Sequence, residues 1–283
     1  MNMRPSRRRG GPPAGPPAGP PAGPSASSPR SASDRGGRGG RGAASAPRGT
    51  CWLYGQHAVQ AALENPARKL RQLLVTAEAQ ETLAARLEGG FPIQPVRTER
   101  GALDTLCGPD AVHQGMALLV DVLTPPDLDT VLEQPGPVLV LDQVTDPRNI
   151  GAILRSAAAF GAVAVVMQDR NAPEETGTLA RAASGALEIV PLIRVVNLSR
   201  VLDALKSRGL WVVGLDAGGG VLDGASFHQR RVALVLGAEG AGLRRLTREH
   251  CDEIAGLAMD SRMESLNVSN AAAVALYEMF RHR

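Results

Sequence analysis

The chain has 283 residues, of which 43% are hydrophobic and 21% charged, enough for a buried core and about two domains. Only 3% are aromatic, which argues against a nucleic-acid platform of several stacking rings. No apolar stretch approaches the ~18 residues of a membrane span, and three well-separated cysteines are typical of a cytoplasmic protein without a disulfide framework.

Residues 1–49 form a low-complexity tail with nine arginines and one acid, a net charge of +8. The rest of the chain carries 22 basic and 27 acidic side chains, a net charge of −5. The segment DRGGRGGRG, 34–42, resembles the RGG segments that bind RNA loosely. A solubilising extension explains the same composition equally well. We therefore predict a disordered basic tail and leave both roles open.

Residues 50–123 are predicted to form a small α/β domain. Its expected helices cover 55–63, 78–87 and 102–106, and its expected strands cover 73–76, 93–96 and 116–122. Four prolines within 124–137 mark that segment as a linker to the next domain.

Residues 138–283 alternate short apolar strands with helices. The expected strands are 138–141, 163–167, 210–215, 232–236 and 254–257, and the expected helices are 149–160, 176–183, 198–208 and 266–280. This order predicts an α/β domain with a mostly parallel sheet covered on both faces. Ligands of such sheets lie beyond the carboxyl ends of the strands. The run Gly218–Gly220 precedes no helix, so we predict a flexible turn there.

The first loop that could carry chemistry follows the strand 138–141. Its sequence places Asn149 where it can cap the next helix, and Arg155 on the second turn of that helix. The plainer interpretation is a capping loop with a surface arginine in a salt bridge.

The second loop, VLGAEGAGLRRLT, places Gly237, Gly240 and Gly242 between a strand and a helix. That context suits a ligand pocket lined by backbone, although a purely structural turn fits as well. The glycine order differs from the dinucleotide and phosphate-loop patterns, and Glu239 would repel a phosphate. NAD and ATP are therefore disfavoured, and a ligand with a positive or hydrogen-bond-donating group is favoured.

The third loop, SLNVSNAAAVALYEMF, has Ser265 and Asn267 at the start of a helix, where capping is the plainer role. A functional role requires both side chains to face the other two loops. The five histidines lack the spacing of metal ligands, so no metal site is expected.

The three loops together resemble the three motifs of the SpoU/TrmH family of RNA ribose 2′-O-methyltransferases. The matching sequences are NIGAILRSAAAFG, LGAEGAGLRRLT and SLNVSNAAAVALYE, in that order. YGQHAVQAAL and AVHQGMALLV resemble the small substrate-binding domain of the same family. The resemblance covers about residues 51–283, which is everything except the tail.

The resemblance implies a catalytic domain of the SPOUT type with a trefoil knot, which general rules of chain topology would not predict. It also implies S-adenosyl-L-methionine as cofactor and a homodimer whose active site uses both chains. Because the sulfonium methyl group of that cofactor is already activated, no metal is needed for the transfer. Carried over by motif, the cofactor would contact Gly237, Leu257 and Leu266. The functional polar positions would be Arg155, Asn149, Glu239, Ser265 and Asn267.

Within the family, the pattern most resembles enzymes that methylate a guanosine of 23S ribosomal RNA. A transfer RNA or another ribosomal site, or a non-catalytic RNA-binding protein of the same fold, remain alternatives. Arg155 is the family's proposed base, but a guanidinium with a pKa above ~12 gives up its proton reluctantly. A contact to the target phosphate is the other role, and the sequence leaves both open.

Overall fold

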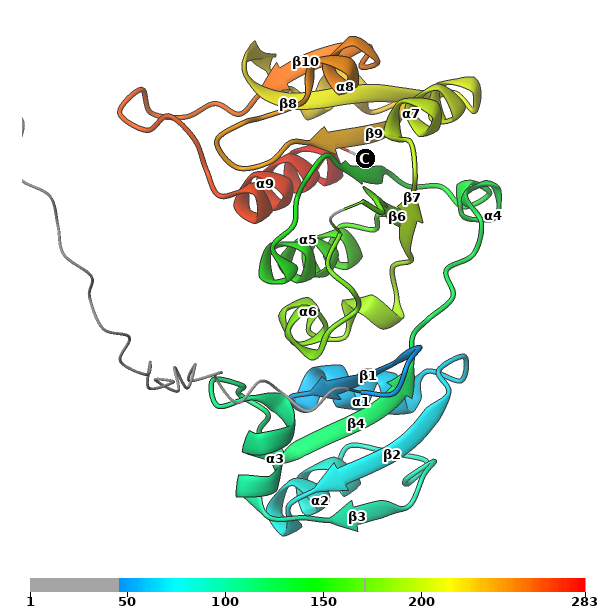
Figure 1. The fold of residues 1–283 in the computed structure, drawn as a ribbon. Coiled ribbons are helices and arrows are strands. Elements are labelled where there is room, and N and C mark those ends of the chain that lie inside the picture. Colours follow the sequence, from blue (N-terminus) through cyan, green and yellow to red (C-terminus); the bar gives the residue numbers. More distant parts are fainter. Residues whose placement is uncertain (1–45, 171, 283) are drawn as a thin grey trace, which may run out of the picture. The chain divides into compact units, whose positions relative to one another are not determined.

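The computed structural model describes residues 46–170 and 172–282, so the predicted tail lies almost wholly outside the described residues. The first part of the described chain is an α/β domain, as expected from the sequence (Figure 1). Its elements are β1 (Thr50–Tyr54), α1 (Gln56–Glu64), β2 (Leu70–Val75), α2 (Ala77–Ala84), β3 (Pro95–Arg97), α3 (Arg100–Cys107) and β4 (Met116–Asp121).

The sheet of this domain has the strand order β1-β4-β2-β3. β4 pairs antiparallel with both β1 and β2, and β3 adds to β2 in parallel. Every second residue of β1 from Cys51 is buried, as is Tyr54 at its end, so one face of the strand packs into the core.

The second part of the described chain contains the larger sheet. Its elements are α4 (Leu128–Leu132), β5 (Val138–Leu141), α5 (Pro147–Ala159), β6 (Ala164–Gln168), α6 (Gly177–Ala183), η1 (Ala186–Glu188), β7 (Leu192–Val195), α7 (Leu198–Ser207), β8 (Leu210–Val221), η2 (Gly224–Phe227), β9 (Arg231–Leu236), α8 (Arg245–Glu249), β10 (Glu253–Gly256) and α9 (Val268–Phe280).

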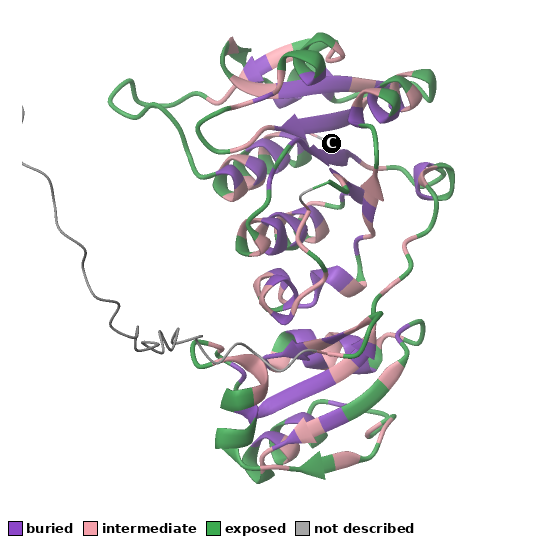
Figure 2. Cartoon of the chain, viewed as in Figure 1, coloured by how far each residue is buried: buried purple, intermediate pink, exposed green. Residues whose placement is uncertain are grey.

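This sheet has the order β10-β8-β9-β5-β6-β7, and every pairing between its described strands is parallel. The predicted parallel sheet is therefore confirmed. Its central strands β5, β6 and β9 are buried on both faces, because helices cover each side (Figure 2). In β5, Leu139 and Leu141 pack with α5, α6 and α9, whereas Val138 and Val140 pack with α4 and α7.

Three parts of the structure differ from the sequence expectation. A short helix, α4, lies inside the segment 124–137 that we predicted as a linker. β1 and β7 were not anticipated, because neither has a clear alternation of apolar and polar residues. The predicted flexible turn at Gly218–Gly220 is wrong: these glycines belong to the 12-residue strand β8.

β8 accommodates the glycines through an irregular pairing with β10. Gly214 pairs with Ile254, but the next residue of β10, Ala255, pairs with Gly220. The intervening residues of β8 bulge out of the ladder, which glycine permits because Gly218 adopts a φ of 92°. A continuous strand with a bulge, paired with β10 on one side and β9 on the other, therefore occupies the place of the expected turn.

None of the helices in the described part of the chain is both long and apolar enough to cross a membrane.

Candidate active site at the carboxyl ends of β5 and β9

Two neighbouring strands place two of the three candidate loops at one edge of the sheet. β5 and β9 are parallel partners, and their last residues, Leu141 and Leu236, stand opposite each other. The loops that leave these strands therefore start side by side, at the edge where ligands of parallel sheets bind.

The first loop leads into α5, whose cap is not the residue we predicted. The side chain of Asp146 accepts a hydrogen bond of 2.8 Å from the backbone N–H of Arg148, and Pro147 is the first helical residue. Asn149 is thereby free of the capping role, and its Nδ2 donates to Oε1 of Glu239 at 2.9 Å.

The second loop folds back on itself after β9. Ala238 and Gly242 form an isolated antiparallel bridge, and Gly240 and Gly242 have φ values of 77° and 64°. Such angles favour glycine strongly. A Cβ on Gly237 would lie 2.2 Å from the backbone carbon and oxygen of Gly242, so this position requires a residue without a side chain.

The third loop ends at α9, and Asn267 has two tasks there. Its Oδ1 caps the helix by accepting from the backbone N–H of Ser269 at 2.9 Å. Its Nδ2 donates to Oε1 of Glu239 at 2.7 Å and to Oδ1 of Asn149 at 3.0 Å. Asn267 therefore caps α9 and also faces the other two loops, which is the arrangement that a functional role requires.

The carboxylate of Glu239 is the point where the three loops meet. Its Oε1 accepts from the two asparagine amides and, at 3.4 Å, from the backbone N–H of Val268. Charge-assisted hydrogen bonds of this kind are about twice as strong as neutral ones. Glu239 thus holds the starts of α5 and α9 against the glycine loop.

A cavity of about 820 Å³ lies between the second loop, the bulge of β8 and the segment 257–267. Six of the eight residues singled out from the sequence line it: Gly237, Glu239, Leu257, Ser265, Leu266 and Asn267. Asn149 reaches the site through Glu239. Arg155 does not line the cavity and is exposed on α5. Its side chain forms no hydrogen bond or ion pair with any of the residues 46–170 and 172–282.

The cavity is lined by carboxylates without basic side chains. Asp216, Glu239, Asp260 and Glu264 contribute to its wall, and none of its described lining residues is Lys, Arg or His. Arg248 of α8 pairs with Asp216 from outside the lining. The Arg262 guanidinium beside Asp260 holds the pKa of that carboxyl below its usual value, so the group stays ionised. The wall therefore favours a ligand that carries positive charge.

Four carboxylates around the site were missed by the sequence analysis: Asp142, Asp216, Asp260 and Glu264. Asp142 follows β5 directly and is fully buried, and it accepts from the backbone N–H and from Nε of Arg244 at 3.1 and 2.6 Å. This contact fixes the far end of the glycine loop. An acidic residue directly after an apolar strand was the available signal. For Asp216, no signal existed before the bulge of β8 was known.

Comparison with known proteins identifies the family. The profile of the SpoU rRNA Methylase family matches residues 136–277, and that of RNA 2′-O ribose methyltransferase substrate binding matches residues 52–126. The chain belongs to the SpoU rRNA methylase family. The predicted family membership is thus confirmed, and the cavity with the Glu239 contacts lies within the part that matches the SpoU methylase profile.

Two relatives and one solved structure show how far the SpoU similarity extends. The chain is 41% identical to the 23S rRNA (guanosine-2′-O-)-methyltransferase RlmB of Photobacterium profundum, over 82% of this chain and 97% of that protein. It is 39% identical to RlmB of Escherichia coli, over 82% and 98%. The crystal structure of the SpoU methyltransferase AviRb from Streptomyces viridochromogenes in complex with AdoMet superposes with a TM-score of 0.70 at 27% identity, covering 82% and 90%.

Proposed function

We propose that this protein transfers the methyl group of S-adenosylmethionine to a ribose 2′-hydroxyl in structured RNA. The target ribose is that of a guanosine in 23S ribosomal RNA. The observation that carries the proposal is the meeting of the three family motifs at Glu239, beside a cavity that suits a cationic cofactor. The similarity to the two RlmB enzymes, each over 82% of this chain, supports the choice of substrate. A ribosomal RNA substrate also implies a cytoplasmic location.

The residues around the cavity fit S-adenosylmethionine. The volume of about 820 Å³ lies in the usual range for pockets that enclose a small organic ligand. Gly237 leaves room for close approach of the backbone, and Leu257 and Leu266 add apolar side chains to the cavity lining. When bound, the cofactor supplies a methyl group already activated by its sulfonium charge, and the carboxylate wall complements that charge.

The acceptor hydroxyl has to be held in line with the methyl group, and such positioning can supply much of the rate. Arg155 is exposed and has no acceptor of its own in the described residues, so its guanidinium is available to an RNA phosphate. Ser265 offers a hydroxyl at the cavity wall. Asn149, Glu239 and Asn267 bind one another, and we assign them the task of keeping the loops in register.

A second copy of the chain would complete the site in this proposal. Arg155 does not line the cavity of its own chain, which agrees with an active site shared between the two chains of a homodimer. Exposed apolar side chains on α9, Val274 and Tyr277, offer surface for such an association. The trefoil knot implied by the resemblance is part of the same proposal.

The proposed cofactor can be tested by calorimetry in the presence of a chelator. We expect S-adenosylmethionine to bind at one site per chain without a divalent ion, because the cavity offers carboxylates and backbone to a cationic ligand. Methylation of 23S ribosomal RNA by the same preparation, with the modified nucleotide mapped, tests the activity. Absence of heat, or heat only after a metal is added, would contradict the proposed cofactor site.

The tail provides a prediction about RNA affinity. The tail has a net charge of +8 and the rest of the chain a net charge of −5, so the tail should dominate non-specific binding of RNA. Because binding releases counterions, this part of the affinity should fall steeply as the salt concentration rises. Deletion of residues 1–49 should weaken RNA binding at low salt and flatten its salt dependence, while the modified nucleotide stays the same. Affinity across a salt series, for both forms, is the measurement. Parallel slopes would assign the tail a solubilising role, and a shifted nucleotide would move specificity into the tail.

A further inference from the structure

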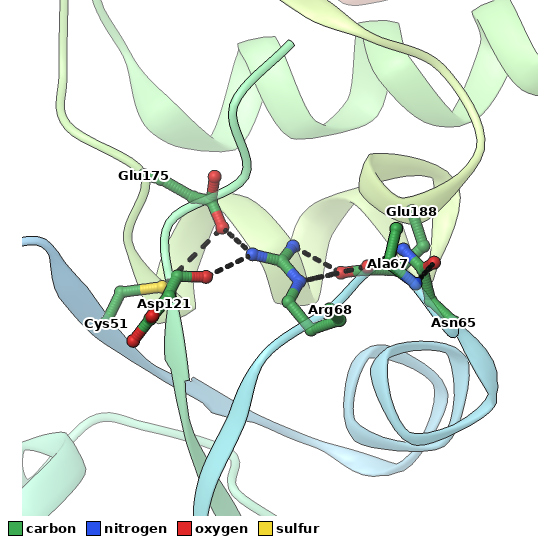
Figure 3. Close-up of polar contacts among 7 residues, drawn as sticks. All are labelled: Cys51, Asn65, Ala67, Arg68, Asp121, Glu175 and Glu188. Atoms are coloured by element: carbon green, nitrogen blue, oxygen red, sulfur yellow. Dashed lines mark hydrogen bonds and ion pairs between the residues drawn. The ribbon is translucent and has the colours of Figure 1, made fainter.

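A buried arginine of the substrate-binding domain bridges two carboxylates of the methylase domain (Figure 3). The side chain of Arg68, in the turn between α1 and β2, has no exposed surface. Its Nη1 donates to Oε1 of Glu175 at 2.7 Å, and its Nε donates to both carboxylate oxygens of Glu188 at 3.1 and 3.0 Å. Nη1 also donates to the backbone oxygen of Asp121 at 3.0 Å.

Two further side chains complete the cluster from the substrate-binding side. Nδ2 of Asn65 donates to Oε2 of Glu188 at 2.7 Å, and Sγ of Cys51 lies 3.6 Å from Oε1 of Glu175. Burial, together with the charge of Glu175, raises the pKa of the Cys51 thiol, so the thiol stays protonated and donates. Burial works against the charge of Arg68, but the hydrogen bonds and charges of the two glutamates outweigh it and hold the pKa of Arg68 above its ordinary value.

The two carboxylates lie at opposite ends of α6. Glu175 precedes the first residue of the helix, Gly177, and Glu188 ends the η1 turn that follows it. One guanidinium therefore binds both the segment that precedes α6 and the η1 turn that follows it. Buried ion pairs add little net stability compared with apolar packing, because desolvation costs about as much as the attraction returns. What the planar fork of arginine does provide is a fixed orientation.

α6 is packed without spare room on both sides. A Cβ on Gly177 would lie 2.4 Å from the backbone oxygen of Trp52 and 2.4 Å from the ring of Tyr54, so α6 touches β1 directly. A Cβ on Gly151 of α5 would lie 2.4 Å from the backbone oxygen of Leu179 in α6. β1, α6 and α5 thus form a stack that cannot slide without steric clash.

We infer that Arg68, Glu175 and Glu188 are positioning residues for methyl transfer. They hold the substrate-binding domain on α6, and α6 sets the place of α5, the helix that carries Asn149 and Arg155. RNA bound by the small domain is thereby presented to Arg155 and the cavity in one geometry. The inference rests on the proposed function and adds to it how binding in one domain is coupled to reaction in the other.

The variant Arg68→Met/Glu175→Gln/Glu188→Gln tests the inference, because it removes all three charges together and leaves no buried ion unpaired. We expect kcat with 23S ribosomal RNA to fall by about 10- to 100-fold, the scale of a ~1 Å misplacement. The dissociation constants for S-adenosylmethionine and for RNA should stay unchanged, since neither binding surface is altered. Amide hydrogen exchange in β1 and α6 should accelerate. Arg68→Lys keeps the positive charge but lacks the planar guanidinium, so it should show a smaller fall in kcat. This variant tests the inference if the triple variant does not fold.

Arg71→Met is the matched control, because Arg71 lies in the same domain but its side chain is 56% exposed, and its partner Asp121 keeps 24% of its side chain exposed. This variant should leave kcat unchanged. A normal kcat in both Arg68 variants, or a parallel loss of cofactor affinity, would assign the cluster a purely structural role and overturn the inference. If the unaltered protein does not methylate RNA, the proposed function fails. In that case, an unchanged rate of amide hydrogen exchange in β1 and α6 of either Arg68 variant would be enough to overturn the proposed coupling between the two domains.

Discussion

Replacing Arg155 by alanine is expected to lower kcat for ribose methylation by about 10²- to 10³-fold, the usual cost of removing one group that stabilises a transition state. The affinity for S-adenosylmethionine should be unchanged, because Arg155 lies on α5 outside the cavity wall. Its side chain is exposed and has no hydrogen bond or ion pair in the described part of the chain, so its removal should cost little stability. Single-turnover methylation with calorimetry of the cofactor separates the two effects.

Arg155→Lys distinguishes the two roles that the sequence leaves open. A contact to a phosphate through charge alone tolerates lysine without a change in pH dependence, whereas a role as base would move the pH dependence of kcat toward the lower pKa of lysine. Arg148→Ala is the matched control, since Arg148 is an exposed arginine on the same helix whose side chain forms no hydrogen bond or ion pair within residues 46–170 and 172–282. Near-normal turnover by Arg155→Ala would remove this residue from the mechanism.

The location of the site could be predicted from the sequence because it depends on strand order and loop chemistry. The apolar runs 138–141 and 232–236 indicated buried strands, and the glycines and polar residues in the segments that follow them marked the loops. Their adjacency, with Leu141 opposite Leu236, then brought the loops together. The role of Glu239 could be predicted from the sequence only in part. A carboxylate in the glycine loop showed that a phosphate would not fit. The contacts of Glu239 with Asn149 and Asn267 could not be predicted, because they span 90 and 28 residues of sequence.

Features that depend on contacts between distant segments could not be predicted. Arg68 meets Glu175 and Glu188 across 107 and 120 residues, and nothing in its local sequence distinguishes it from an exposed arginine. The glycines of β8 indicated a turn, because only the pairing with β10 shows that the strand continues beyond a bulge. The cap of α5 was assigned to Asn149 although Asp146-Pro147 offers the better cap, an acidic side chain before a proline at the first helical position.

Gly237→Ala is expected to weaken cofactor binding more than any other substitution that adds one methyl group to the site. The new Cβ would lie 2.2 Å from the backbone carbon and oxygen of Gly242, and backbone atoms cannot rotate away as a side chain can. The loop therefore has to open, and Glu239 moves with it. Over-packing of this kind costs ~1–3 kcal/mol. If the loop incurs this cost in the conformation that binds the cofactor, S-adenosylmethionine should bind about 5- to 150-fold more weakly.

Gly220→Ala is the control for this effect, because it adds the same methyl group to β8 close to the cavity, where no atom lies within 4 Å and φ is not positive. Its affinity for the cofactor should match that of the unaltered protein. Calorimetry of both variants, with thermal unfolding measured in parallel, separates loss of the site from loss of the fold. Tight binding by Gly237→Ala would mean that the glycine loop is not the cradle of the cofactor. The ligand would then have to be held by other residues of the cavity lining, such as Leu257 and Leu266.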